Sequence, residues 1–208
     1  MSSDALNNEK LDWALAFDTS AAHCAAALLC GDRVIVRHEA MAKGQAERLI
    51  PLLEEMLAEA GIAWPDICVI GVGTGPGNFT GVRISVAAAR GLALGLGIPA
   101  IGVTALEAMA FGAALPVTVM IDARRGEVYV QKFADGGIGT AQLLAAHDAI
   151  PDGIVIGLDG TDPHYPLAEA IARIAVLRMS DQQPRPAPFY LRGADAAPPS
   201  DPPPVILP

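Results

Sequence analysis

The sequence predicts an α/β protein in which the second half repeats the structural plan of the first half in a reduced form. Two observations support this prediction. Short, continuously apolar segments alternate along the chain with segments that carry apolar residues at helical spacing. In addition, an apolar strand that ends in an aspartate and is followed by a second strand occurs at 13–20 and again at 117–124, which indicates an internal duplication.

The plan divides the chain into two lobes with a short extension at each end. The chain has 208 residues, of which 52% are hydrophobic and 18% charged, a composition typical of a well-packed domain. We expect a flexible N-terminus at 1–12, a first lobe at 13–115, a second, smaller lobe at 116–192 and a proline-rich tail at 193–208.

The first half is expected to begin with an antiparallel meander, because the turn Gly31–Asp32 separates two apolar runs. The helix at 45–61 has a broad apolar face and Gly61 as its C-terminal cap, whereas Pro51 predicts a late start or a kink near residue 50. In order, we expect strands at 13–20, 23–30 and 33–40, a helix at 45–61, a strand at 67–73, a helix at 80–97, a strand at 99–104 and a helix at 105–114.

The second half contains fewer elements. An apolar strand at 117–124 is followed by an alternating strand at 127–133, and a further strand is expected at 153–158. A helix is expected at 166–178. From residue 181 onward, frequent prolines predict extended chain with little helix or sheet.

Charge and hydropathy limit the classes of partner. The chain carries 14 basic and 23 acidic residues, a net charge of −9, so we expect no tight nucleic-acid binding of its own. The apolar run 84–103 is interrupted by Arg90, Gly91 and Pro99, which predicts a helix, a turn and a strand and no membrane span. The N-terminal segment is polar, so we expect no secretory leader and a cytoplasmic protein.

The three cysteines form no C-x-x-C pair, and we expect them to be buried thiols.

The most distinctive segment is the glycine-rich stretch 71–83, GVGTGPGNFTGVR. It lacks the lysine of a Walker loop and has no third glycine in the register of a dinucleotide-binding fingerprint. A strand, a glycine turn and a helix N-terminus still present free backbone N–H groups to an anion. The same glycines also suit a tight structural turn, and the residues alone leave both interpretations open.

Asp18 and Asp122 end the two equivalent strands, at the edge where open α/β sheets bind their ligands. Facing carboxylates could hold a magnesium ion near phosphates, whereas the alternative is a solvated strand end or a turn cap. The histidines have no metal-binding spacing, no G-x-S-x-G elbow is present, and Ser20 and Ser85 have no visible base. We therefore predict no catalytic residue and no metal site.

The helix at 80–97 carries a stripe of small residues, Ala87, Gly91 and Gly95, at four-residue spacing. Such a stripe lets another helix approach closely, although it could equally pack on the protein's own sheet. Together with the broad apolar face of the helix at 45–60, it favours a helix-bundle interface with a partner chain.

Several motifs resemble one family. The string GTGPGNFTGVR at 73–83, with LAFDTS at 15–20 and IDARRGEVY at 121–129, is similar to the TsaB family, also called YeaZ. Members of this family are the non-catalytic partner subunit in bacterial threonylcarbamoyladenosine modification of tRNA. The segments 45–57 and 188–192 extend the resemblance across residues 13–192.

The resemblance implies an actin-like ATPase fold (the ASKHA, ribonuclease H-like class) with two duplicated lobes. It also implies a heterodimer with TsaD through a bundle of the helices at 45–60 and 80–97, with TsaE joining the assembly and a homodimer possible through the same helices. No cofactor of its own is implied, and ATP or ADP is expected, if at all, at the partner interface. The implied interface residues are Leu49, Leu53, Met56, Arg83, Ala87, Arg90, Gly91 and Gly95. The positions of the degenerate phosphate loops are Asp18, Thr19, Ser20, Gly75, Gly77 and Asp122.

Two positions depart from the family pattern: Asn78 stands where the family usually has serine, and Gly44 where it often has histidine. The predicted function is a scaffold subunit that supports TsaD in threonylcarbamoyl transfer to the tRNA adenosine next to the anticodon. The alternative is an active ATP-dependent phosphotransferase with Asp18 and Asp122 around magnesium-ATP. A peptidase, a third interpretation, lacks metal ligands in the sequence.

Overall fold

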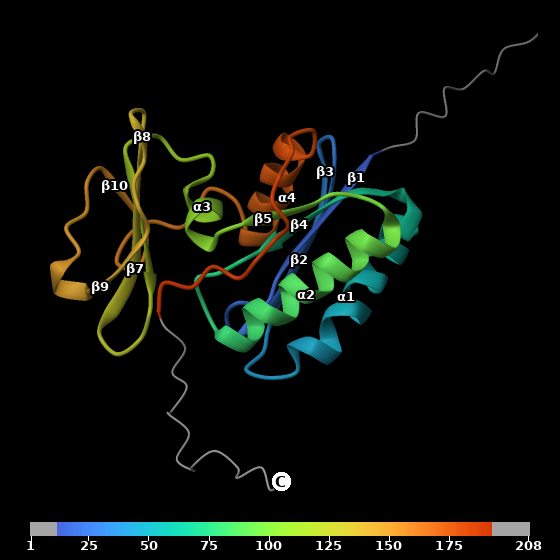
Figure 1. Cartoon of the computed structure of the whole chain (residues 1–208), viewed down its shortest axis with the longest axis horizontal. Helices are drawn as coiled ribbons and strands as arrows, with labels where there is room; N and C mark the ends of the chain where they lie inside the picture. The colour runs from blue at the N-terminus through green and yellow to red at the C-terminus, as the bar shows by residue number, and fades with distance from the viewer. Residues whose placement is uncertain (1–11, 193–208) are drawn as a thin grey trace, which may run out of the picture.

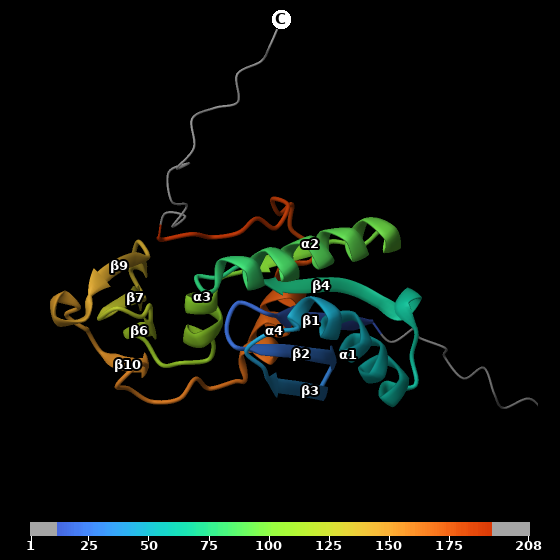
Figure 2. The same cartoon turned by 90° about the horizontal axis from the view of Figure 1, so that it is seen from below.

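The computed structural model describes residues 12–192, which form two sheets lying side by side (Figure 1). Helices α1 (Gln45–Ala60) and α2 (Phe79–Leu96) cover one face of the first sheet. Helix α4 (Leu167–Arg178) covers the opposite face of the same sheet, and Figure 2 shows these layers from a second direction. Helix α3 (Ala105–Ala110) lies between the two sheets, in contact with both α4 and the second sheet.

The first sheet has the strand order β3-β2-β1-β4-β5 and the second has β10-β6-β7-β8, with β9 also paired to β7. The first is built from β1 (Trp13–Asp18), β2 (His23–Cys30), β3 (Arg33–Ala40), β4 (Ile67–Gly73) and β5 (Ala100–Val103). The second is built from β6 (Val117–Asp122), β7 (Glu127–Ala134), β8 (Gly137–Ile138), β9 (Gln142–Ala145) and β10 (Ile154–Gly157). Short 3₁₀ turns lie at η1 (Trp64–Asp66) and η2 (Ala146–Asp148).

The two sheets repeat one plan of strand pairing. In the first, β1 is antiparallel to β2 and parallel to β4. In the second, β6 is antiparallel to β7 and parallel to β10. The predicted duplication of strand, terminal aspartate and hairpin is therefore confirmed, and the predicted meander β1–β2–β3 is confirmed as well.

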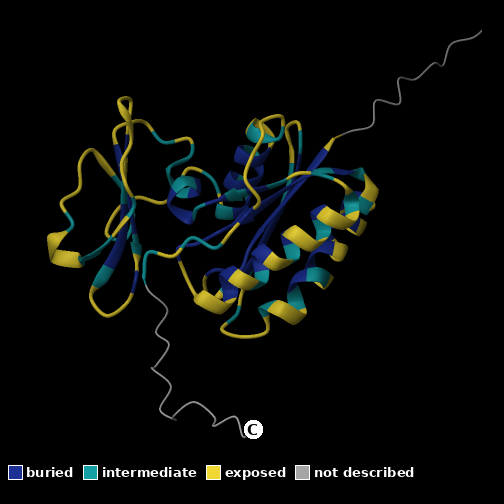
Figure 3. Cartoon of the chain, in the orientation of Figure 1, coloured by how far each residue is buried: buried dark blue, intermediate teal, exposed yellow. Residues whose placement is uncertain are grey.

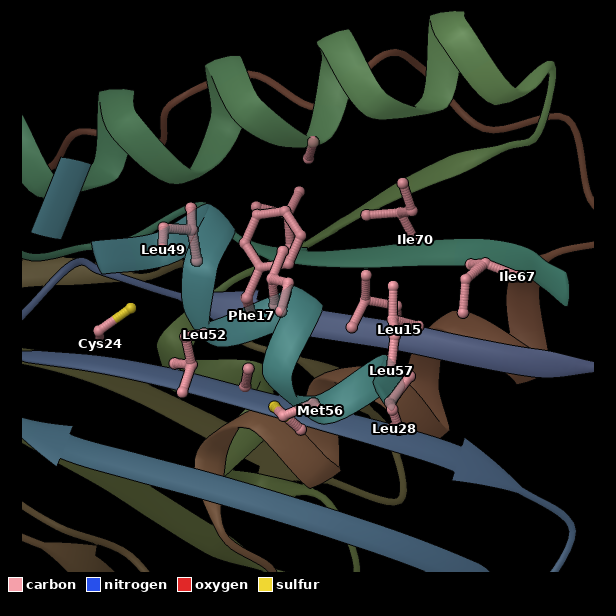
Figure 4. Packing of buried hydrophobic residues seen from close by; sticks show 14 of the residues in the cluster. Leu15, Phe17, Cys24, Leu28, Leu49, Leu52, Met56, Leu57, Ile67 and Ile70 are labelled. Carbon is pink, nitrogen blue, oxygen red and sulfur yellow. The ribbon is translucent and has the colours of Figure 1, made fainter. Parts of the chain in front are cut away.

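The side chains of β1 alternate in size. Trp13, Leu15 and Phe17 pack in the cluster under α1 and α2, where Figure 4 shows Leu15 and Phe17. Ala14 and Ala16 point to the other face and contact the α4 side. Successive side chains of a strand alternate between faces, so large residues fill the space under two helices while alanines let α4 lie close.

Helix α1 begins at Gln45 and continues through Pro51 to the left-handed cap at Gly61. Of the two expectations for this region, a late start or a kink near residue 50, the late start is wrong. The helix runs without interruption from residue 45. Pro51 lies on the exposed side of the helix, and the burial of the next two residues, Leu52 and Leu53, offsets the loss of one backbone hydrogen bond.

Helix α4 corrects the predicted lobe boundary. The sequence placed 166–178 in the second lobe, but α4 packs against β1, β2 and β4 of the first sheet. Ile171, Ala172 and Ala175 of α4 are buried there with the alanines of β1 and β2. The chain thus crosses to the second sheet after α3 and returns to the first sheet through α4.

After α4, residues 184–192 run as an extended strap that links the two sheets. The strap's Phe189 N–H donates to Thr74 O, at the end of β4, at 2.8 Å. Arg192 at its end donates to Ala123 O at 3.1 Å and pairs with Glu127 in the second sheet. The strap therefore fixes the glycine-rich loop relative to the turn between β6 and β7.

The first prediction concerns Gly71, at which a side-chain carbon would lie 2.9 Å from Ile171 Cγ2 and 3.0 Å from Ala175 Cβ. We expect Gly71→Val to lower the free energy of unfolding by about 1–3 kcal/mol, because it forces α4 off the sheet. Urea denaturation measures the loss. The matched control is Gly91→Ala, where the added carbon meets open space and an increase of about 0.5–1 kcal/mol is expected from helix propensity; equal effects would contradict the close packing of α4.

A second prediction follows from Arg48 of α1, which donates to Glu39 of β3 and to Glu55 of α1, each at 2.6 Å. The hydrogen bonds from Arg48 lower the pKa of both carboxyls below the ordinary value of 4.5. A lowered pKa in the folded state contributes stability that is complete above pH 4.5 and is lost as the pH falls through the lowered value. The difference in unfolding free energy between the wild type and Arg48→Met should therefore shrink on acidification, in denaturation curves recorded from pH 7 to 3; a difference that stays constant over this range would show that the bridge contributes nothing.

Candidate functional site

The turn after β1 holds a completely buried carboxylate. Asp18 is 0% exposed, and its Oδ1 accepts hydrogen bonds from Ser20 N–H at 2.9 Å and Ser20 Oγ at 2.9 Å. His23 Nε2, at the start of β2, lies 2.8 Å from the same oxygen. Three partners on one oxygen compensate the cost of burying the group, so Asp18 organises the turn that joins β1 to β2.

Asp122 occupies the equivalent position at the end of β6. Its Oδ1 accepts a hydrogen bond from Arg124 N–H at 2.8 Å. Asp18 makes the equivalent bond, because it also accepts from the backbone N–H of the residue two positions later, Ser20. Unlike Asp18, Asp122 is exposed. The sequence left three roles open for these aspartates: a magnesium ligand, a solvated strand end or a turn cap. In the structure, both carboxylates cap their own turns.

The glycine-rich loop packs directly on the turn that Asp18 organises. A side-chain carbon at Gly73 would overlap Asp18 Oδ2, and one at Gly81 would overlap Thr19 O. Thr19 Oγ1 donates to Gly81 O at 2.7 Å, which ties the turn to the first turn of α2. These glycines are needed because the Asp18 side chain fills the space beside Gly73 and the Thr19 backbone fills the space beside Gly81. The interpretation as a tight structural turn therefore describes the loop.

Gly77, Asn78 and Gly75 complete this contact. A side-chain carbon at Gly77 would overlap Ser20 O, and Asn78 N–H donates to Ser20 O at 2.6 Å. The Asn78 side chain accepts from Gly81 N–H at 2.9 Å and so caps the N-terminus of α2. Gly75 is buried, and its carbonyl accepts from Ala105 N–H at 2.8 Å.

The predicted phosphate-loop positions therefore fall into two groups. Five of them, Asp18, Thr19, Ser20, Gly75 and Gly77, lie in or beside one contact in the first lobe, and Asp122 lies in the second sheet. A magnesium-nucleotide does not fit Asp18: Oδ1 already has three partners, and Oδ2, buried without a hydrogen-bond partner, faces Gly73. Within residues 12–192, no three metal-binding side chains come together.

The structure divides the predicted interface residues between core and surface. Leu49, Leu53 and Met56 of α1 are at most 1% exposed and pack on the first sheet. The prediction that they contact a partner is wrong, because the apolar stripe of α1 is fully used in covering its own sheet.

The outer face of α2, in contrast, lies on the surface (Figure 3). We use this term for the exposed residues Arg83, Ala87, Arg90, Gly91, Leu94 and Gly95. A side-chain carbon at Gly91 or Gly95 would meet nothing within 4 Å, and Leu94 is 84% exposed. This face carries small residues, is partly apolar and is open at Gly91 and Gly95. Close helix–helix contact requires such a face.

Helix α2 also satisfies the length and hydropathy of a membrane span. Its inner residues Val82, Val86, Ala89 and Ala93 are buried in the core of the first sheet. The burial of these inner residues explains the high hydropathy of α2. The sequence likewise predicts a helix of a folded lobe here and no membrane span.

Arg83 lies at the start of the outer face, in a contact that joins α2 to the strap. Its guanidinium lies 3.8 Å from the ring centroid of Phe79, and its Nε donates to Tyr190 Oη at 3.1 Å. The rings of Phe79 and Tyr190 stack at 5.0 Å. Two aromatic residues from distant parts of the chain thereby hold one arginine in place.

Sequence reasoning missed His23, Phe79 and Tyr190. His23 follows Asp18 by five residues across a hairpin, and Phe79 precedes Arg83 by one helical turn, so both had a local signal. Tyr190 is 107 residues from Arg83, and no spacing rule connects them. Of the cysteines, Cys24 is buried as predicted, and burial raises the pKa of its thiol to about 11, whereas Cys30 and Cys68 are half-buried.

Comparison with known proteins identifies the class. A protein-family model described as "TsaD: tRNA N6-adenosine threonylcarbamoyltransferase" matches residues 36–182. An uncharacterized protein of Mycobacterium tuberculosis is 34% identical over 183 residues, covering 82% of this chain and 84% of that one. The tRNA threonylcarbamoyladenosine biosynthesis protein TsaB of Escherichia coli is 42% identical over 120 residues, which are 55% of this chain and 52% of that protein. The match thus spans about half the length of this curated relative.

Solved structures give the same answer for the fold. A Pseudomonas aeruginosa protein described as similar to peptidase YEAZ superposes with a TM-score of 0.69 at 30% identity, covering 88% of this chain and all of that one. YeaZ from Pseudomonas aeruginosa superposes with a TM-score of 0.67 at 27% identity. The two-sheet α/β architecture is that of these YeaZ structures. The chain belongs to the TsaB (YeaZ) family.

A third prediction contrasts the two equivalent aspartates. Asp18→Ala should lower the free energy of unfolding by about 2–4 kcal/mol, because it leaves buried donors of Ser20 and His23 without their acceptor. Asp122→Ala removes one bond at an exposed turn and should cost about 0.5 kcal/mol. Chemical denaturation of both variants measures the contrast, and an equal loss at the two sites would contradict the structural role of Asp18.

Proposed function

We propose that this chain is a non-catalytic subunit that binds a TsaD-type transferase and supports threonylcarbamoyl transfer to the tRNA adenosine next to the anticodon. The observation that carries the proposal is the outer face of α2, which is exposed and open at Gly91 and Gly95. Membership of the TsaB family supplies the pathway, because the curated relatives in Escherichia coli and Haemophilus influenzae are named for threonylcarbamoyladenosine biosynthesis.

A non-catalytic role agrees with the state of the nucleotide-site positions. Asp18 is buried against Gly73 and bonded within its own turn, and the glycine loop is filled by contacts with Thr19 and Ser20. A group that acts on substrate must be reachable by it. These positions now maintain the fold, so we assign the chemistry to the partner.

The revised interface rests on α2, with α1 contributing its polar rim. Because Leu49, Leu53 and Met56 are occupied in the core, the partner meets the small and basic residues of α2 and the exposed glutamates of α1. With a net charge of −9, the chain repels phosphate, so the proposal places tRNA on another subunit. TsaE is expected to join the assembly through that subunit.

The fourth prediction tests this surface. Gly91→Trp or Gly95→Trp should weaken binding to the TsaD-type transferase of the same organism by at least about tenfold, since the indole occupies the space that the partner helix needs. Stability should not fall, because both positions are open and glycine is a poor helix former. Titration calorimetry gives the affinity, and urea denaturation gives the stability.

The control is Leu177→Trp on α4, which is 70% exposed on the opposite side of the first sheet and should leave binding unchanged. Reconstitution of tRNA modification with the other purified subunits, with and without this chain, tests the function itself. Full modification without the chain, or normal binding by both glycine variants, would exclude the proposed role or the proposed surface, respectively.

A further inference from the structure

The second sheet carries a helix on only one of its faces. Helix α3 packs on the face that holds Val119 and Tyr129. The opposite face holds a separate apolar cluster, to which none of the described helices α1–α4 contributes a residue. Figure 1 shows α3 on the inner side of this sheet and only the short turn η2 on its outer side. Both faces of the first sheet are covered by helices, so this outer face differs from them.

A groove of about 460 Å³ lies on the outer face. We call it the outer groove, and its lining includes Val130 and Lys132 of β7, Gln142 and Leu144 of β9, and Ile150. Val130 and Leu144 belong to the apolar cluster of this face, whereas Ile150 is 77% exposed. Side chains two positions apart on a strand share a face, which brings Lys132 next to Val130. The outer groove is therefore an apolar strip with a basic residue at its side.

The outer groove contains one charged residue without a partner in the described part of the chain. Its acidic residue, Asp148, has Oδ1 at 3.5 Å from Nε2 of His147. Lys132 is exposed, and no ion pair of this lysine is formed within residues 12–192. An occupant with bulky apolar side chains and one carboxylate therefore matches the outer groove in both shape and charge.

The tail that follows the strap has this composition. The strap ends at Arg192, which is bonded to Ala123 O and to Glu127 at the start of β7. Residues 193–208 contain one run of bulky apolar residues, Val205–Leu207, and Asp201 precedes this run by four positions. Prolines flank the run on both sides, which restricts the backbone and reduces the entropy lost on binding.

The tail also begins close enough to reach the outer groove. Strand β9 pairs with β7 beside the anchor of the strap, with Ala145 opposite Glu127. The twelve residues 193–204 separate Arg192 from the apolar run, and at about 3.1 Å each in an extended, proline-rich conformation they span about 37 Å. A path around the edge of the sheet crosses strands about 4.8 Å apart and a layer about 10 Å thick. The length of the tail exceeds this path.

We propose that the tail 193–208 binds its own chain, with Val205, Ile206 and Leu207 in the outer groove and Asp201 beside Lys132. The tail then covers the one face of the second sheet that has no helix, and it shields Ile150 from solvent. This contact goes beyond the proposed function and is independent of it, because no partner chain takes part.

A photo-crosslinking residue in the full chain tests the contact directly. With Ile206→p-benzoylphenylalanine, the cross-links located by mass spectrometry should fall within residues 130–150. The control is Ala197→p-benzoylphenylalanine, which lies before the proline spacer and should give at least about fivefold fewer links to this segment, because proximity determines the yield. Copies labelled with heavy and light nitrogen are mixed, so that links within one chain are distinguished from links between two chains.

Substitutions in the outer groove show whether its chemistry is responsible. Ile150→Glu should lower the yield at least about fivefold, because it places a charge among the apolar side chains. Ile138→Glu, an equal change at an isoleucine that is 65% exposed and outside the groove, should leave the yield unchanged. Lys132→Glu should lower the yield about threefold, and its combination with Asp201→Lys should restore it. Circular dichroism verifies that each variant is folded.

Hydrogen exchange gives a second measurement without the probe. Replacement of Val205, Ile206 and Leu207 by serine in the full chain should speed exchange of the β9 amides, Gln142–Ala145, about threefold, because local opening is no longer opposed by the bound tail. The amides of β1, in the core of the first sheet, should exchange as in the wild type.

Three outcomes would overturn the proposal. Links between heavy and light copies only would assign the outer groove to a second copy of the chain. Links to the first lobe, or no links, together with unchanged exchange in β9, would show that the tail does not occupy the groove. An equal loss of yield in Ile150→Glu and Ile138→Glu would show that the contact does not depend on the outer groove.

Discussion

The contact between the glycine-rich loop and the turn after β1 is the constraint on which the rest of the first lobe depends. Gly77 and Gly81 bring two backbones together so closely that no side chain fits between them, and Gly73 leaves room for the Asp18 side chain. Asp18 supports this contact from below, with all of its hydrogen bonds made inside its own hairpin. The contact fixes where α2 begins, and hence which residues of α2 face the sheet and which face solvent. The strap is anchored at the same place, through Thr74.

This contact also occupies much of the polar edge of the first sheet. The turn and the loop are positioned as a ligand-binding edge of an α/β sheet would be, but Asp18 Oδ1 and Thr19 Oγ1 are bonded within the chain, and Asp18 Oδ2 is buried against Gly73. Asp18 and Asp122 occupy equivalent places with different surroundings: Asp18 is a buried organiser of its turn, and Asp122 is an exposed turn cap.

Sequence patterns predicted most elements and the duplication, because strand alternation and the cap at Gly61 are local signals. They did not predict which sheet α4 covers, since an apolar stripe shows that a helix is buried but does not identify what buries it. The same ambiguity led to the wrong assignment of Leu49, Leu53 and Met56 to a partner surface. One apolar stripe suffices to cover a sheet, so a second, separate face is needed before an interface is inferred. Helix α2 has such a second face. Its exposed glycines and arginines, which contribute little apolar area, distinguish it from the buried stripe.

The composition of the outer face of α2 accounts for a balance between stability and association. A large apolar patch would stabilise a complex but would also promote aggregation of the free subunit. Small residues leave little apolar area exposed, and arginines keep the free surface hydrated while remaining able to pair with carboxylates. Charged groups at an interface contribute more to the choice and orientation of a partner than to raw affinity. Under the proposed function, the open space beside Gly91 and Gly95 allows close packing, and a basic face on a chain of net charge −9 favours an acidic partner surface.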